Sequence, residues 1–212
     1  LPVILAHVCH PQLAGECVET KAPWIAQPVG VDFLAEAVAV IDEGIVGGNG
    51  IGVFIAAAVD TWVRHYDHRQ PAFRVASRSL GESEPPDPST GFPGVFTVCL
   101  NTDPYTYLGS RGISLAPEAA LDQPLVMVTM RSLALGRLLP VLAGALGFSR
   151  VPLSACPAVD HRTELAEALV RGHRPVPYQV DGDYMGEATE LAFRYEPEAL
   201  DLVVPLGSPA RR

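Results

Sequence analysis

The stretch PVPYQVDGDYMG, residues 175–186, decides the fold expected for this chain. Asp181-Gly182 stands between two β-prone runs, and glycine accepts the positive φ that tight hairpin turns require. The stretch therefore predicts a β-hairpin. Asp181 and Asp183 are two residues apart and would share one face of an extended strand. Two neighbouring carboxylates raise the pKa of one of them, which suits a general base. Such pairs also occur in plain turns, so both interpretations stay open at this point.

More strands and several helices are expected around this hairpin. Short apolar or β-branched runs predict strands at Leu1–Ala6, Phe96–Leu100, Leu125–Met130, Leu191–Tyr195 and Leu200–Val204. Apolar residues at helical spacing predict helices at Asp32–Gly44, Ala56–His65 and Leu133–Leu146. Thr163–Arg171 is ambiguous, and its apolar spacing suits a helix. We expect Tyr178–Val180 and Leu191–Tyr195 to be neighbouring antiparallel strands.

One segment, Ser77–Gly94, breaks these patterns because it is rich in proline, serine and acidic residues. Such a segment buries little apolar surface. We expect it to be a surface loop or lid and the most mobile internal stretch; a domain linker is the alternative.

Composition narrows the class of protein. The chain has 212 residues, of which 48% are hydrophobic and 18% charged, as in a globular protein with a sizeable core. Its net charge of -9, with no long basic run, argues against binding to a nucleic acid backbone. The same balance argues against strong electrostatic capture by an anionic membrane, although a local patch could still dock on lipid.

The cysteines and the apolar stretches indicate the compartment. Four cysteines without a paired CxxC spacing predict a cytoplasmic protein with reduced thiols. Leu133–Phe148 is the longest strongly apolar stretch, but it is short and interrupted, so we expect no transmembrane segment. The chain starts with an apolar run and no Met, which predicts a fragment whose upstream part is missing.

Two metal hypotheses and one nucleotide hypothesis are weaker than their structural alternatives. His7, Cys9 and His10, with Cys17 as a distant fourth ligand, match no zinc spacing and are expected in a loop, His7–Pro11. His65 and His68 suit a solvated helix end. The glycine-rich run 47–52 nearly matches a dinucleotide fingerprint, but we expect it only to permit a turn and close packing.

Three blocks carry a resemblance to a known family. The first is residues 175–186, and the second is EPEALDLVVP, residues 196–205. The third combines NTDPYTYLG, residues 101–109, with LAPEAALD, residues 115–122. In this order they resemble the C-terminal part of bacterial diacylglycerol-kinase-type lipid kinases, in the style of the actinobacterial branch, within the superfamily that includes sphingosine kinases and NAD-kinase-like proteins.

The resemblance implies an α+β fold with two domains. Residues 1–45 would be the remnant of an α/β nucleotide-binding domain. Residues 46–212 would form a β-rich, β-sandwich-like domain whose last strand, Leu200–Val204, returns to the first domain.

The resemblance also implies an activity, namely ATP-dependent phosphorylation of a lipid hydroxyl at a membrane surface, with diacylglycerol as the leading substrate. Asp183 holds the position of the family's general base, as Asp where many members have Glu. Asp122 keeps the first acid of the family's magnesium segment, while the Gly and the last Asp of that segment are missing. ATP and Mg²⁺ are thus the expected cofactors. The protein would be cytoplasmic and peripheral to the membrane, with a homodimer left open.

One departure from the family favours a different class of protein. The GGDGT phosphate loop is absent from the sequence, so no ATP-binding residue is identified. The alternative is a degenerate, non-catalytic lipid-kinase homologue that binds lipid or a partner; an α+β domain of unrelated role is the third option.

Overall fold

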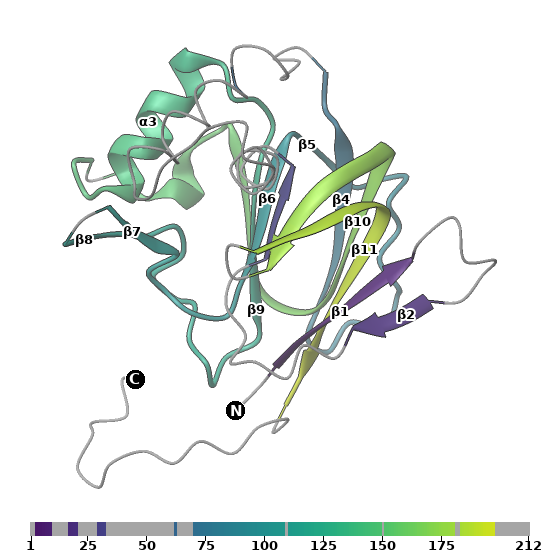
Figure 1. Ribbon diagram of the computed structural model, residues 1–212. Coiled ribbons are helices and arrows are strands. Elements are labelled where there is room, and N and C mark those ends of the chain that lie inside the picture. Colours follow the sequence, from purple (N-terminus) through teal and green to yellow (C-terminus); the bar gives the residue numbers. More distant parts are fainter. Residues whose placement is uncertain are drawn as a thin grey trace, which may run out of the picture.

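The computed structural model describes residues 70–108, 110–149, 151–180 and 183–197, together with Trp62 and three N-terminal strands at 3–9, 17–20 and 29–32. The described residues are mostly antiparallel strands, with one α-helix, α3, and a short 3-10 helix, η1 (Figure 1). This agrees with the β-rich, sandwich-like architecture that the sequence predicts. The predicted strand Leu200–Val204 lies outside the described residues.

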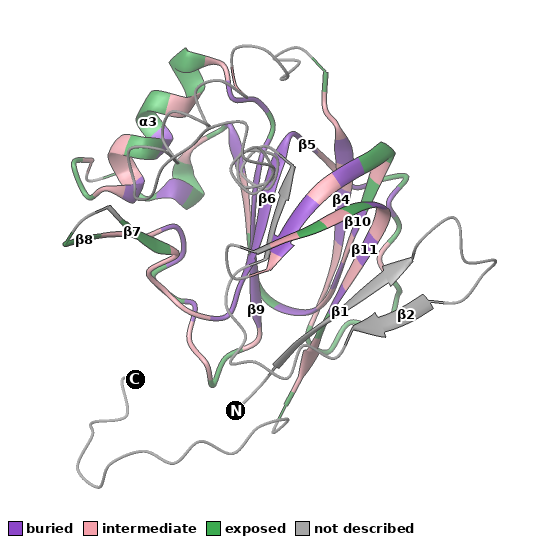
Figure 2. Cartoon of the chain, in the orientation of Figure 1, coloured by how far each residue is buried: buried purple, intermediate pink, exposed green. Residues whose placement is uncertain are grey.

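Two fully buried strands form the centre of the fold. β6 (Phe96–Leu100) and β9 (Leu125–Met130) have the bounds that the sequence predicts, and every residue in both is buried (Figure 2). They pair antiparallel, with Phe96 opposite Met130 and Leu100 opposite Val126. A strand covered on both faces favours apolar residues at every position. Both strands are apolar except for Thr97 and Thr129, whose buried hydroxyls hydrogen-bond each other at 2.8 Å.

One long strand joins the two layers of the sheet. β10 (Val159–Val180) pairs with β9 over its first residues and with β3 (Val29–Asp32) over its last. β3 in turn pairs with β6, so the strands β10, β3, β6 and β9 close a circuit. The middle of β10 pairs with β4 (Phe73–Ser79) and β11 (Asp183–Glu196), which form the second layer.

The bends of β10 have local causes. Glu164 has a positive φ of 55°, and the register with β9 shifts between Arg162 and Leu165. The register with β11 shifts again between Arg171 and Val176. There a Cβ on Gly172 would lie 2.3 Å from the Arg174 carbonyl oxygen, so only glycine fits.

The segment Thr163–Arg171 is therefore strand, and the helical interpretation of its sequence was wrong. Its residues pair with β4 on one side and β11 on the other, for example Val170 with Val75 and with Leu191. Pairing on both sides outweighs a local apolar spacing that would also suit a helix.

The predicted break at Ser77–Gly94 is shorter than expected. Ser77–Ser79 belong to β4, and Phe92–Gly94 form β5, which pairs with β4. The segment between them, 80–91, is mostly exposed. The Asp87 carboxylate accepts hydrogen bonds from the Ser89 backbone N–H at 2.8 Å and the Ser89 hydroxyl at 2.6 Å. Arg74 donates to the Gly91 carbonyl at 2.9 Å. Greater mobility of this segment stays a prediction.

The N-terminal strands belong to the same sheet. β1 (Val3–Cys9) pairs with β11 and with β2 (Cys17–Thr20). The predicted strand at the start is confirmed from Val3, but His7, Val8 and Cys9 continue it, so the predicted loop was wrong there. The boundary at residue 45 stays a prediction, because residues 33–61 lie outside the described residues; they include most of the predicted helix Asp32–Gly44, whose Asp32 ends β3.

The second side of β6 and β9 is covered by a helical layer. α3 (Leu135–Ala145) lies within the predicted helix Leu133–Leu146, which is thereby confirmed. η1 (Leu153–Ala155) follows it, and the short pair β7 (Thr106–Leu108) and β8 (Arg111–Ile113) lies on the same side of the fold (Figure 1).

Two buried clusters fill the spaces between the layers. The strand-side core, between the two strand layers, contains Phe73, Val75, Cys99, Leu125, Met127, Leu165, Ala168, Val170, Val176, Tyr178, Ala188, Leu191 and Phe193. The helix-side core, beneath α3, contains Val95, Phe96, Val98, Leu100, Leu115, Ala116, Ala119, Val126, Val128, Met130, Leu133, Val141, Ala145, Leu153 and Val159. Cys99 and Leu100 are neighbours in β6 but belong to different cores, as alternating side chains of one strand must.

Candidate functional site

The predicted hairpin forms the first part of the candidate site. β10 ends at Val180, β11 begins at Asp183, and these two residues are register partners. The prediction that Tyr178–Val180 and Leu191–Tyr195 lie in neighbouring antiparallel strands is confirmed, since they belong to β10 and β11. Asp181 and Gly182 lie outside the described residues, and the catalytic role of Asp183 stays a prediction.

The strand register brings three separate sequence blocks to one end of the sheet. Val180 lies opposite Val29, Val29 opposite Cys99, and Cys99 opposite Met127. The chain leaves β6 at this end toward residues 101–109, and it enters β9 here from residues 115–122. The turn between β10 and β11 is at the same end. All the blocks that the sequence singles out, apart from residues 196–205, therefore converge there.

Asp183 begins β11, and Asp122 lies in the turn before β9, both at this end of the sheet. The row from Asp183 through Val180, Val29 and Cys99 to Met127 crosses four strand-to-strand steps. At about 4.8 Å for each step, the path along the sheet is roughly 19 Å long, and the direct separation is shorter because the strands close a circuit. The register thus places the two predicted site residues at one end of the fold, on different elements.

Two buried polar side chains form a hydrogen bond next to the hairpin. Gln179 is 4% exposed and donates its amide N–H to the Tyr105 hydroxyl oxygen at 3.2 Å. Burial raises the pKa of Tyr105 to about 12, while the hydrogen bond with Gln179 acts in the opposite direction. This contact ties the strand that ends at the hairpin to the loop of residues 101–109.

Two buried amides at this end have unused hydrogen-bonding atoms. Neither side-chain polar atom of Asn101, which is 1% exposed, has a partner among the described residues, and neither does the Gln179 Oε1. A buried polar atom without a partner costs about 1–3 kcal/mol, so such atoms mark places where water or a polar ligand group belongs. The sequence analysis quoted Asn101 and Gln179 within motifs but did not single them out as site residues.

Asp103 connects the two halves of the block at residues 101–122. Its Oδ1 accepts hydrogen bonds from the backbone N–H groups of Leu115, at 3.1 Å, and Ala116, at 3.3 Å. A Cβ on Gly112 would lie 3.1 Å from the Pro104 side chain, so glycine allows the close approach of β8. Asp103, Pro104 and Gly112 are thus structural residues of this end.

Asp122 is exposed in the turn before β9. Over the ranges that the structure describes, no three His, Cys, Asp or Glu side chains gather into a group that could hold a metal ion. Those residues therefore offer Asp122 no ready set of co-ligands. A magnesium ion at Asp122 stays a prediction, and the same holds for ATP.

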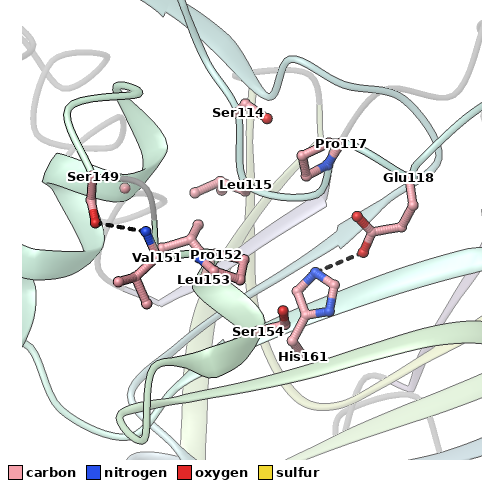
Figure 3. Close-up of a pocket in the computed structure, with 11 residues that line it drawn as sticks. Ser114, Leu115, Pro117, Glu118, Ser149, Val151, Pro152, Leu153, Ser154 and His161 are labelled. Atoms are coloured by element: carbon pink, nitrogen blue, oxygen red, sulfur yellow. Dashed lines mark hydrogen bonds and ion pairs between the residues drawn. The ribbon is translucent and has the colours of Figure 1, made fainter.

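A pocket of about 220 Å³ lies beside the end of α3 and is lined in part by η1 (Figure 3). His161 Nε2 lies 2.9 Å from Glu118 Oε1 on one wall, and Ser154 lies near His161 in the close-up. On the opposite wall, the Ser149 hydroxyl oxygen accepts a hydrogen bond from the Val151 N–H at 3.1 Å. Asp122 is not among the described residues that line this pocket.

Only some of the histidines and cysteines considered as metal ligands lie in the described part of the chain. His7 and Cys9 lie in β1, and the register places Cys9 opposite Cys17 in β2 and His7 opposite Glu19. His10, His65, His68 and the glycine-rich run 47–52 lie outside the described residues. Within the described part of the chain, no helix combines the length and the apolar character needed to cross a membrane.

Comparisons with known proteins give limited matches. No protein-family model and no curated protein matches the chain. Among solved structures, a "putative diacylglycerol kinase from Bacillus anthracis str. Sterne" is similar at 14% identity and a TM-score of 0.49, over 93% of this chain and 54% of that one. A second structure of that description gives 14% and 0.47, over 93% and 55%. A structure of "a diacylglycerol kinases" from the same organism gives 12% and 0.44, over 93% and 51%. The chain thus spans about half the length of these structures, and a likeness of this size assigns it no function.

Proposed function

We propose that the protein takes part in ATP-dependent phosphorylation of a lipid hydroxyl, with diacylglycerol as substrate and phosphatidic acid as product. The observation that carries the proposal is the convergence of the motif-bearing segments at one end of the sheet. The hairpin with Asp183, the loop with Asn101 and the turn with Asp122 lie far apart in sequence, and the register brings them to this end. The resemblance of those segments to lipid kinases, in the style of the actinobacterial branch, supplies the reaction.

In the proposed reaction the lipid hydroxyl oxygen attacks the γ-phosphorus of ATP. The new O–P bond forms as the bond to the β,γ-bridging oxygen breaks, and ADP leaves with that electron pair. The Asp183 carboxylate accepts the proton of the attacking hydroxyl. Asp122 is the proposed contact for Mg²⁺, which would offset phosphate charge, and the residues that hold ATP are unassigned.

The contacts beneath the hairpin support this role for Asp183. A general base must be held in place to accept a proton, and Asp has a shorter reach than Glu by one methylene. Gln179, four residues before Asp183, is buried and hydrogen-bonded to Tyr105. This bond limits the freedom of the strand just before the turn. We propose that the protein works at the cytoplasmic face of a membrane.

The test is phosphate transfer from ATP to diacylglycerol in mixed micelles, measured on the complete gene product. Asp183→Asn keeps the shape of the side chain but cannot accept the proton, so the rate should fall about 10²–10⁴-fold while the fold is retained. Asp181→Asn is the matched control, because it makes the same change at the turn. It should lower the melting temperature more than the activity per folded molecule. Full activity of Asp183→Asn would remove that residue as the base.

The second candidate is a non-catalytic lipid-kinase homologue that binds lipid or a partner. The departure of residues 122–126 from the family's magnesium segment, which keeps Asp122 but lacks the Gly and the last Asp, favours it. Titration calorimetry with ATP and Mg²⁺ separates the two, since only the kinase must bind ATP. A complete gene product that neither binds ATP nor transfers phosphate would support the second candidate.

A further inference from the structure

The apolar character of α3 extends beyond its buried side. Val141 and Ala145 are buried in the helix-side core, and Leu138 packs against it. Next to this side around the helix, Leu135, Leu139 and Leu142 are 54%, 59% and 41% exposed; their spacing of four and three residues places them in one stripe. A helix with one solvent-facing side normally carries polar residues there. The outer stripe of α3 is therefore unusual for a surface in contact with water.

The exposed apolar character continues past the helix. Phe148 is 70% exposed and Val151 is 60% exposed, a few residues after α3 ends. Five of the eight large hydrophobic side chains that are exposed in the described part of the chain thus lie between residues 135 and 151. We call the five residues Leu135, Leu139, Leu142, Phe148 and Val151 the apolar surface. Such a concentration marks an interaction site more often than chance exposure.

The charge around the apolar surface differs from that of the rest of the chain. The chain carries 24 acidic residues and a net charge of -9, yet no Asp or Glu occurs from Gln123 to Val159. Arginines are present instead: Arg137 is exposed on α3, and the Arg111 guanidinium lies 4.2 Å from the centroid of the Phe148 ring. The stretch that carries the apolar surface therefore has arginines and no acidic residue, and Glu118 lies nearby in the pocket that Val151 also lines.

We propose that the apolar surface docks on an anionic phospholipid bilayer. Leucine and phenylalanine side chains gain free energy at the boundary of headgroups and acyl chains, and a cation beside them, here Arg111 against Phe148, can contact lipid phosphates. A second copy of the chain fits less well, because a symmetric contact through this surface would bring the arginines of both copies together, and the stretch from Gln123 to Val159 has no acidic residue to offset them.

Hydrogen bonds connect this surface with the candidate site. The Ala145 carbonyl, in the last turn of α3, accepts a hydrogen bond from the Ser114 N–H at 2.9 Å. The next two residues, Leu115 and Ala116, bind Asp103, and the same loop reaches β10 through Tyr105 and Gln179. Docking through α3 would thus hold the candidate site near the lipid. The inference rests on the proposed function for its choice of lipid as the partner.

The test measures binding of the 212-residue chain to vesicles by co-sedimentation, without ATP. Vesicles of phosphatidylcholine alone are compared with mixed phosphatidylcholine–phosphatidylglycerol vesicles, and the chain should prefer the mixed ones. The triple variant Leu135→Gln, Leu139→Gln, Phe148→Gln should bind at least about tenfold more weakly, because each side chain that leaves water on docking contributes up to roughly a tenfold factor. Arg111→Glu should remove the preference for the anionic vesicles, because the Arg111 guanidinium lies against Phe148.

The matched control makes the same change at two exposed apolar side chains elsewhere, Leu80→Gln with Met185→Gln; Leu80 is 60% exposed and Met185 45%. This control should bind like the parent. Absence of parent binding, unchanged binding of the triple variant, or an equal loss in the control would each overturn the proposal. A parent dimer that the triple variant disrupts, with no vesicle binding, would show that a second copy covers the surface and would also overturn it. Vesicle binding by the 212-residue chain, together with no kinase activity of the complete gene product, would refute the proposed function alone.

Discussion

The two outer faces of this molecule differ sharply in their chemistry. On the β10–β11 layer, Glu167 forms one ion pair with Arg78 at 3.1 Å and another with Arg194 at 3.2 Å. Arg171 and Glu190 form a further pair at 2.6 Å on the same two strands. The opposite face, on α3, exposes a leucine stripe and has no acidic residue along the helix.

The difference shows that net charge describes this chain poorly. Both layers bury apolar residues against β6 and β9 in the same way, so the cores alone do not predict what the outer faces do. The acidic residues are distributed unevenly: Glu167 and Glu190 pair with arginines on the strand layer, whereas α3 has one arginine and no acidic residue. A soluble face and a docking face can thus coexist in a chain of net charge -9.

The largest expected effect comes from the strand-side core. Phe193 is 1% exposed in β11, and Phe193→Ala should lower the free energy of unfolding by about 3–5 kcal/mol, since it removes a buried ring and leaves a cavity. Urea denaturation measures this. Met185→Ala on the same strand, at a side chain that is 45% exposed, should change it by less than about 0.5 kcal/mol. Similar losses in both variants would contradict the assignment of inner and outer positions on β11.

The next effect separates the two sides of α3. Val141 is 3% exposed, so Val141→Ala should cost about 1–3 kcal/mol, from roughly 0.8 kcal/mol for each buried methylene-sized group and the cavity term. Leu139→Ala removes a larger group but from a side chain that is 59% exposed, and should cost less than about 0.5 kcal/mol. Thermal melts of both variants check this. A larger loss for Leu139→Ala would mean that another part of the chain covers the outer stripe.

An intermediate effect concerns Tyr105, which connects the loop of residues 101–109 to β10 through its hydrogen bond with Gln179. Its pKa is raised from 10.0 to about 12 by burial, so the folded chain holds the phenolic proton more tightly than the unfolded chain. The stabilising contribution is complete below about pH 10 and is lost as the pH rises to about 12, by roughly 1.4 kcal/mol for each pH unit. Burial also raises the pKa of Tyr178, in the same direction.

Denaturation curves across this alkaline range measure the effect. Tyr105→Phe should flatten the pH dependence, with the share of Tyr178 remaining. At neutral pH it should cost about 1 kcal/mol, because the hydrogen bond with Gln179 is lost. An unchanged alkaline slope in Tyr105→Phe would show that this phenol does not titrate as a buried group.

The smallest effect belongs to the ion pairs of the strand layer. Glu167→Gln removes the charge shared by Arg78 and Arg194 and should cost about 0.2–1 kcal/mol at low salt, because partly exposed pairs are weak. The difference from the parent should shrink as salt is added, since salt screens such pairs. Melts at two salt concentrations check this. A salt-independent loss of several kcal/mol would place this network among buried interactions.

The sequence predicted the central elements well, for reasons that particular residues make clear. Apart from Thr97 and Thr129, β6 and β9 are apolar runs between turns, the pattern of a strand buried on both faces, and α3 is an uninterrupted helical run apart from Arg137 and Pro140. β10 was harder to predict. Its middle, Thr163–Arg171, has an apolar spacing that also suits a helix, and pairing with β4 and β11 decides its conformation. Its partners in β4 lie 86 to 97 positions away in the sequence, which no local window contains.

For the candidate site, the sequence predicted individual residues but not how they are arranged in space. The motif pointed to Asp183, and Asp122 followed from the resemblance, but their common location at one sheet end depends on the register of five strands. The hydrogen bond between Tyr105 and Gln179 joins residues 74 apart in sequence, and no local sequence pattern near either residue predicts it. Asn101 is the clearest missed signal, because an asparagine directly after a fully apolar strand has to be satisfied or solvated.

The participation of β10 in both layers has a consequence for how the molecule unfolds. Because one continuous strand pairs with β9 at its start, with β4 and β11 in its middle and with β3 at its end, neither layer can unfold while the other keeps all its pairings. Amide protons of β9 and of β11 should therefore exchange with solvent through the same cooperative event, and both should do so at a rate close to that of global unfolding.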